Sequence, residues 1–142
     1  MTYSTQDKLI KRYGESLLIE LTDRAEVPTG QIDPTVVTDA ITGAAALIDG
    51  HLQGRYVLPL SETPPLIEEL AEQIAIYKLH LYEPDAKKVE EYKDAKATLR
   101  QIAKGEVRLP VQGVEPATQP GNGVRVNDRK RPLTPDNLKG FI

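Results

Sequence analysis

The chain has 142 residues and a formal net charge of −3, with 39% hydrophobic and 27% charged residues and no cysteine. This length suits one domain, and the composition is ordinary for a soluble globular protein. The lack of cysteine excludes disulfides, thiolate chemistry and cysteine-ligated metal sites. No apolar run approaches the about 18 to 20 residues that span a membrane, and no secretory signal is visible in the first thirty residues.

Two short helices are predicted near the N-terminus. Thr5 can cap a helix over residues 6–13, and Gly14 stands where a left-handed residue ends a helix. Leucines spaced by three to four residues predict a second helix over residues 15–21. Residues 22–30, which include a proline and a glycine, are predicted to form a loop.

Three longer helices follow. Asp33 as cap and Pro34 in the first turn predict a helix over about residues 34–53. Its segment 43–46 (Gly-Ala-Ala-Ala) has little side-chain bulk. Since glycine costs about 1 kcal/mol in a helix interior, we expect another helix to approach closely there.

The next predicted helix begins at Pro64-Pro65, runs to about Tyr82 before Pro84, and is apolar enough to form the centre of the core. A last helix is predicted from a cap at Asp85 to about Lys104, with Gly105 ending it.

The character of the chain changes after this helix. Residues 1–104 carry 12 basic and 17 acidic side chains, whereas residues 105–142 carry 6 and 4. From Pro110 to Ile142 there are five prolines and four glycines, with the apolar residues isolated from one another. Such a segment cannot bury enough surface to offset its ordering entropy when alone. The sequence therefore predicts an all-α fold, a small bundle of about four to five helices (residues 1–105) with a long extended C-terminal arm (residues 106–142) that docks on neighbouring molecules.

No constellation in the sequence suits catalysis or a cofactor. His51 and His80 lack helical partners for a shared metal ion, and the loop at residues 22–33 lacks the alternating oxygen ligands of a calcium loop. Glu68 and Glu69 diverge on a helix, which fits a solvated face better than acid–base work. We therefore predict a protein that is not an enzyme, with no cofactor and no metal site.

The arm holds the candidate contact residues. A basic cluster could meet phosphate or an acidic protein surface, and the absence of interleaved aromatic residues favours protein. Isolated apolar residues nearby are candidate anchors, with Leu133 and Phe141 foremost. The predicted interface comprises Arg125, Arg129, Lys130, Arg131, Leu133, Leu138, Phe141 and Ile142.

Blocks of this sequence resemble one known family. Residues 1–14 (MTYSTQDKLIKRYG), residues 18–24 (LIELTDR), residues 48–60 (IDGHLQGRYVLPL) and the double proline at 64–65 are similar to the Mu-like prophage head–tail connector family. The resemblance covers about residues 1–105. The loop at residues 23–33 departs from the acidic, glycine-rich pattern of relatives, and the arm offers no alignment.

The resemblance implies a structural role in the virion. Phage adaptor, or head-completion, proteins are small helical bundles that assemble, commonly as a dodecameric ring, between the portal protein and the stopper or tail. The implied partners are further copies of the chain, the portal protein and a stopper or tail-terminator protein. DNA would pass through the lumen without specific binding, and no membrane is involved. A small DNA-binding or DNA-packaging factor is the alternative.

Overall fold

The computed structural model describes residues 2–111 of the chain. In this part there are five helices and no strand, so the all-α prediction is confirmed. The helices are α1 (Gln6–Tyr13), α2 (Glu15–Thr22), α3 (Pro34–Leu52), α4 (Pro65–Leu79) and α5 (Ala86–Lys104).

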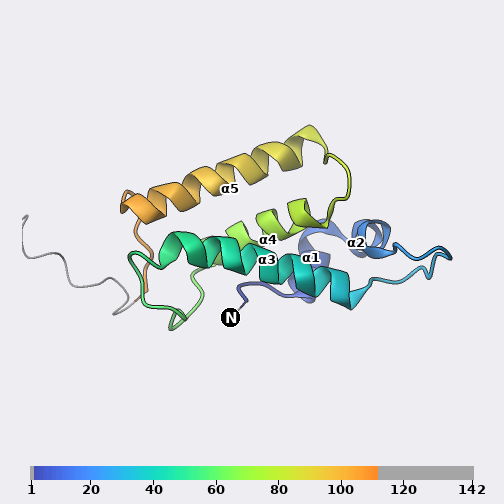
Figure 1. Ribbon diagram of the computed structural model, residues 1–142, viewed down its shortest axis with the longest axis horizontal. Coiled ribbons are helices and arrows are strands. Elements are labelled where there is room, and N and C mark those ends of the chain that lie inside the picture. Colours follow the sequence, from blue (N-terminus) through green and yellow to red (C-terminus); the bar gives the residue numbers. More distant parts are fainter. Residues whose placement is uncertain (1, 112–142) are drawn as a thin grey trace, which may run out of the picture.

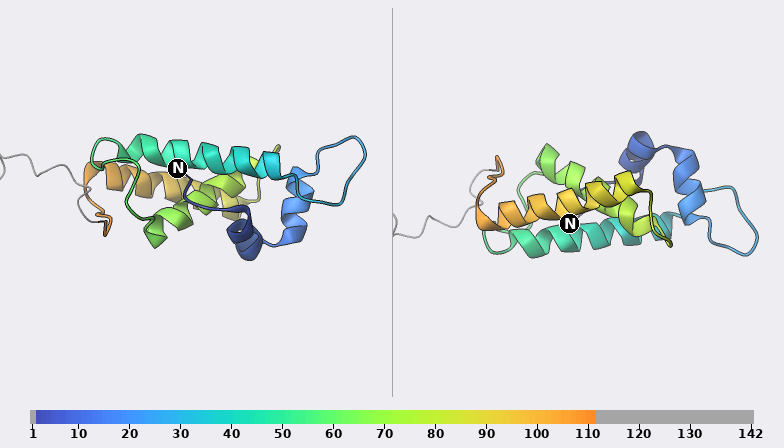
Figure 2. Two further views of the ribbon diagram at one scale, coloured as in Figure 1. Left: turned by 90° about the horizontal axis from the view of Figure 1, so that it is seen from below. Right: turned by 90° about the horizontal axis from the view of Figure 1, so that it is seen from above.

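α3 and α5 lie side by side along the long axis of the molecule, and α4 packs against both at an incline (Figures 1 and 2). α4 runs antiparallel to α3 and to α5 and contacts both, while α1 contacts α3 and α4. The loop at residues 23–33 and the α4–α5 connection therefore lie at one end. The α3–α4 connection and residues 105–111 lie at the other end.

The small residues of α3 permit its close contact with α4. Ala44 and Ala45 are buried, and a Cβ placed on Gly43 would lie 3.3 Å from the Cδ atom of Lys78 in α4. The small residues at this point thus make room for the Lys78 side chain, and the close approach of the helix backbones at residues 43–46 stays a prediction. As predicted, α4 is the centre of the core. Its buried residues include Ile67, Leu70, Ala71, Ile74, Ala75, Ile76 and Leu79.

The prediction that α4 continues to Tyr82 is wrong. The helix ends at Leu79, and Leu81 and Tyr82 are 64% and 87% exposed. The side chain of Arg24 donates to the carbonyl oxygen of Leu21 at the end of α2 (3.1 Å) and to that of Leu79 (2.8 Å). A guanidinium that binds terminal carbonyls is stabilised by the negative ends of the helix dipoles. Arg24 thereby satisfies one carbonyl at each helix end.

The start of α5 follows the prediction at its cap position. Asp85 is the N-cap residue, but its side chain makes no bond to the helix backbone. Its carboxylate instead accepts from Lys88 Nζ at 2.7 Å.

The end of α5 is fixed by a second arginine. Gly105 has φ +82°, and Arg55 from the α3–α4 connection donates to the carbonyl oxygens of Ala103 (2.8 Å) and Lys104 (2.9 Å). A Cβ on Gly105 would lie 2.5 Å from the Cζ atom of Arg55. The glycine predicted at this helix end is therefore needed for its backbone angle, and a side chain there would displace the Arg55 guanidinium from the two carbonyl oxygens.

Packing continues beyond Gly105. Leu109 is buried, and its backbone N–H donates to the hydroxyl oxygen of the buried Tyr56 at 3.0 Å. The chain therefore leaves the described part beside the α3–α4 connection. The division into a body and an arm at residues 105/106 stays a prediction.

Two glycines differ in what they contribute to the backbone. Gly50 lies inside α3, and no atom lies within 4 Å of the position that a Cβ would take there, so Gly50→Ala should raise the free energy of unfolding by about 0.5–1 kcal/mol. Gly105→Ala should lower it by more than about 1 kcal/mol, because strain adds to the clash with Arg55. Chemical unfolding followed by circular dichroism measures both. Equal effects of the two substitutions would contradict this reading.

The contact of Tyr56 with Leu109 gives a separate prediction. Tyr56→Phe keeps the ring but removes the acceptor of a buried backbone N–H, which should cost about 1–3 kcal/mol of unfolding free energy. Amide hydrogen exchange should speed up at Leu109. Unchanged exchange there would show that the hydroxyl does not hold this segment.

Candidate interaction surface

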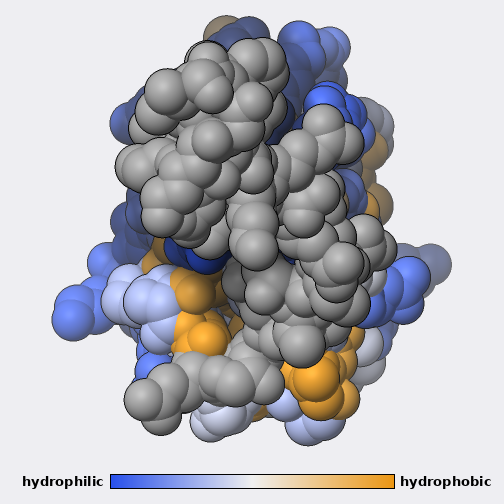
Figure 3. All heavy atoms as spheres, turned by 90° about the vertical axis from the view of Figure 1, so that its left-hand side faces the viewer, coloured by the Kyte–Doolittle hydropathy of each residue, from blue (hydrophilic) through white to orange (hydrophobic). Residues whose placement is uncertain are grey.

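Four large apolar side chains in residues 2–111 are more than half exposed, and they lie at the two ends of the bundle. Val27, Leu81 and Tyr82 lie at the end where α2 and α4 finish, and Val57 lies in the α3–α4 connection at the other. Figure 3 looks onto this second end and shows hydrophobic residues at the surface among hydrophilic ones. Exposed apolar groups that gather in this way typically mark contact surfaces.

A groove of about 480 Å³ opens at the first end. We call it the end groove. Its walls come from α2 and from the connection between α4 and α5. The lining residues are Leu17, Glu20, Leu21, Asp23, Arg24, His80, Leu81, Tyr82 and Glu83.

The end groove is acidic as well as apolar. Three carboxylates line it (Glu20, Asp23 and Glu83) against the single guanidinium of Arg24. That guanidinium is already bound to two helix-terminal carbonyl oxygens. The groove therefore offers a net negative field beside an exposed tyrosine ring, which suits a basic and partly apolar ligand.

The loop beside the groove is closed by one carboxylate. Asp23 accepts from the backbone N–H groups of Thr29 (2.9 Å) and Gly30 (2.9 Å) and from the Thr29 hydroxyl (3.1 Å). The bonds from the Gly30 and Thr29 backbones lower the pKa of Asp23. This carboxylate organises the backbone of the loop.

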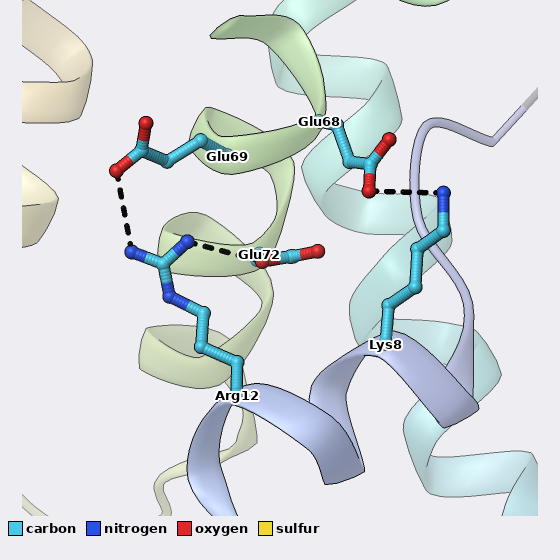
Figure 4. A network of polar contacts seen from close by, with 5 residues as sticks. All are labelled: Lys8, Arg12, Glu68, Glu69 and Glu72. Carbon is cyan, nitrogen blue, oxygen red and sulfur yellow. Dashed lines mark hydrogen bonds and ion pairs between the residues drawn. The ribbon is translucent and has the colours of Figure 1, made fainter. Parts of the chain in front are cut away.

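A polar network joins α1 to α4 on another face (Figure 4). Lys8 pairs with Glu68 at 3.0 Å, and Arg12 pairs with Glu72 at 3.0 Å and with Glu69 at 3.4 Å. Glu68 and Glu69 do diverge, as expected, but each binds a partner on α1. This network was not predicted from the sequence. The sequence does contain a matching pattern. Lys8 and Arg12 are four residues apart, as are Glu68 and Glu72, so each pair lies on one face of its helix.

The N-terminal lead-in is also anchored. The hydroxyl of Tyr3 donates to a carboxylate oxygen of Asp49 in α3. Burial of the ring, followed by this bond and the nearby negative charge, raises the pKa of Tyr3. Tyr3 thus holds the residues before α1 against α3.

Both histidines bond within their own helices or helix ends. His51 Nδ1 lies 2.9 Å from the carbonyl oxygen of Leu47, and His80 Nδ1 lies 2.8 Å from that of Ile76. In the part of the chain that the structure describes, no three His, Cys, Asp or Glu side chains are grouped to hold a metal ion. No helix between residues 2 and 111 is long and apolar enough to cross a membrane.

The contact residues predicted from the sequence lie outside the described residues. These are Arg125, Arg129, Lys130, Arg131, Leu133, Leu138, Phe141 and Ile142. The end groove was not predicted, because its exposed Leu81 and Tyr82 were assigned to a longer α4.

Comparisons with known proteins cover both the helices and the C-terminal segment. The family model of bacteriophage Mu Gp36 matches residues 3–128. The chain is 31% identical over 142 residues to gene product J of Escherichia phage Mu, which covers all of both chains. It is 30% identical over 141 residues to the Mu-like prophage FluMu protein gp36 of Haemophilus influenzae, covering 99% of this chain and 98% of that one. The similarity therefore extends well beyond the residues 1–105 that the sequence blocks suggested.

The α1–α4 network can be tested by removing its buried and exposed pairs separately. Arg12→Ala should lower the unfolding free energy by about 1–2 kcal/mol, because the Glu72 carboxylate loses its partner in a largely buried position. Glu69→Ala, which removes an exposed partner, should cost under about 0.5 kcal/mol. Adding Glu72→Gln to Arg12→Ala should restore part of the loss. Equal costs for Arg12→Ala and Glu69→Ala in urea unfolding would contradict this assignment.

Proposed function

The chain belongs to the bacteriophage Mu Gp36 family, and on that premise we propose that it is an adaptor subunit of a tailed-phage head–tail connector. In this role copies of the chain form a ring between the portal protein and the stopper or tail. The ring holds its neighbours and lets DNA through, and it performs no catalysis. The family assignment makes the chain a phage protein, and the adaptor role follows from the resemblance of its sequence blocks to connector proteins.

The observation that carries the proposal is the placement of exposed apolar side chains at opposite ends of the bundle. Two different surfaces on one subunit allow head-to-tail contacts, and such contacts generate a closed ring when the rotation between subunits closes. Covering Leu81 and Tyr82 in such a ring would remove from water apolar surface that the isolated subunit exposes.

The ionisable groups support a structural role. Lys8, Arg12, Arg24 and Arg55 bind carboxylates or helix-terminal carbonyls, and Asp23 binds loop amides. Each of these charges stabilises the fold of the subunit. The acidic balance of the helical part would also keep it from trapping DNA in a lumen, since carboxylates repel phosphate.

The proposal predicts where the protein sits and what its loss does. Phage production from a genome that lacks this gene should yield heads and tails that do not join, and the full-length chain with an N-terminal tag should restore joined particles. Gold labelling of that tag, viewed by negative-stain electron microscopy, should mark the neck. The purified chain should co-purify with portal or tail protein.

Two outcomes would contradict the adaptor role. The first is normal joining of heads and tails without the gene. The second is label distributed elsewhere in the virion, together with a salt-sensitive shift of DNA in a gel, which would instead indicate a packaging factor.

A further inference from the structure

We propose that the end groove binds the C-terminal segment of a second copy of the chain, residues 125–142. The inference deepens the adaptor proposal and rests on it in one respect, that copies of the chain meet in an assembly. It assigns an acceptor site for the arm on the helical part of the neighbour.

The apolar chemistry of the two partners matches. The groove presents the exposed ring of Tyr82 and the side chain of Leu81 above Leu17 and Leu21 of α2. The segment carries isolated apolar residues around the sequence Pro132-Leu-Thr-Pro135. Two prolines at this spacing favour the polyproline II conformation, which packs on aromatic rings and loses little entropy on binding. The apolar anchors of the segment are Leu133, Leu138, Phe141 and Ile142.

The charges match as well. Between residues 125 and 131 there are four basic side chains and one acidic one. The groove offers Glu20 and Glu83, while Asp23 is held by loop donors and the guanidinium of Arg24 by carbonyl oxygens. Basic residues just before the prolines would lie beside these carboxylates, which would fix the direction of the bound segment.

The exit point of the described chain favours a neighbour's groove over its own. Leu109 is bound to Tyr56 at the end of the bundle opposite the end groove. The two ends are separated by the length of α5, which is about 28 Å for its 19 residues. Between Val111 and Arg125 lie 13 residues, and random-coil statistics give a linker of that length an average span of only about 20 Å. A neighbour packed head to tail would bring its groove next to this exit.

The natural lack of cysteine allows a direct test by cross-linking of full-length chains. One variant carries Leu81→Cys in the groove, and another carries Gly140→Cys beside Phe141. These positions keep Tyr82 and all four apolar anchors. A mixture of the two variants should form a disulfide between residues 81 and 140 under mild oxidation, identified by mass spectrometry of the linked peptides.

A matched control uses the exposed apolar residue at the other end. Val57→Cys mixed with Gly140→Cys should give at least about tenfold less cross-link, although Val57 is 65% exposed and its thiol is equally accessible. Adding Tyr82→Ala, or Glu20→Gln with Glu83→Gln, to the Leu81→Cys chain should lower the yield severalfold. Added salt should lower it too, because exposed charge pairs are screened.

Three results would overturn the proposal. One is equal cross-linking of residue 140 to residues 57 and 81. Another is a yield that Tyr82→Ala leaves unchanged. The third is a concentration-independent link within a single chain that carries both Leu81→Cys and Gly140→Cys, which would place the segment on its own groove.

The test separates this inference from the adaptor role. If the tagged chain labels the neck and restores head–tail joining but no 81–140 link forms, the groove assignment is wrong and the adaptor role stands. A strong 81–140 link in a chain that is absent from the neck would keep the groove and remove the adaptor role.

Discussion

The contact between α3 and α4 is the constraint on which the rest of the structure depends. α4 contacts α3, α5 and α1, and α3 also contacts α5 and α1, so the packing of α4 on α3 constrains where both α5 and α1 lie. Gly43, Ala44 and Ala45 place little side-chain bulk on the packed surface of α3, and Gly43 lies against a side chain of α4. The glycine costs about 1 kcal/mol in helix propensity, which the added packing of α4 can offset. The Lys78 side chain of α4 lies against Gly43.

Around that centre, two arginines bind the carbonyl oxygens at the ends of three helices. Arg24 binds the terminal carbonyls of α2 and α4, and Arg55 binds those of α5. Each supplies positive charge and hydrogen bonds where a helix leaves carbonyls unpaired. The early stop of α4 places Leu81 and Tyr82 outside the bundle and opens the end groove. Arg55 and Tyr56 hold the residues after α5 beside the α3–α4 connection, at the end of the bundle that lies opposite the end groove. The two surfaces proposed for assembly are thus consequences of how two helices are terminated.

The sequence predicted the features that depend on local chemistry. The helix starts at Thr5, Asp33 and Asp85 and the glycine that ends α5 were all placed correctly, because capping is decided within a few residues. The end of α4 was missed, and one of its terminal carbonyls is bound by Arg24, 55 residues away in the sequence. The α1–α4 ion pairs were missed for the same reason. The end groove could not be predicted without the correct end of α4, and the predicted contact residues of the arm lie outside the described part of the chain.

The apolar side chains exposed at the ends of the bundle make part of the protein's stability depend on assembly. A leucine side chain that stays in water forgoes about 1.5–3 kcal/mol of burial energy, and Leu81 and Tyr82 both stay largely in water in the isolated subunit. A partner that covers them recovers this energy, and any ligand that binds only the folded state adds to its stability in proportion to the logarithm of ligand concentration. If the partner is a second copy, the apparent stability of the chain must rise with its own concentration. The core between α3 and α4 is buried within one subunit and does not need the partner. The subunit can therefore fold first and assemble afterwards.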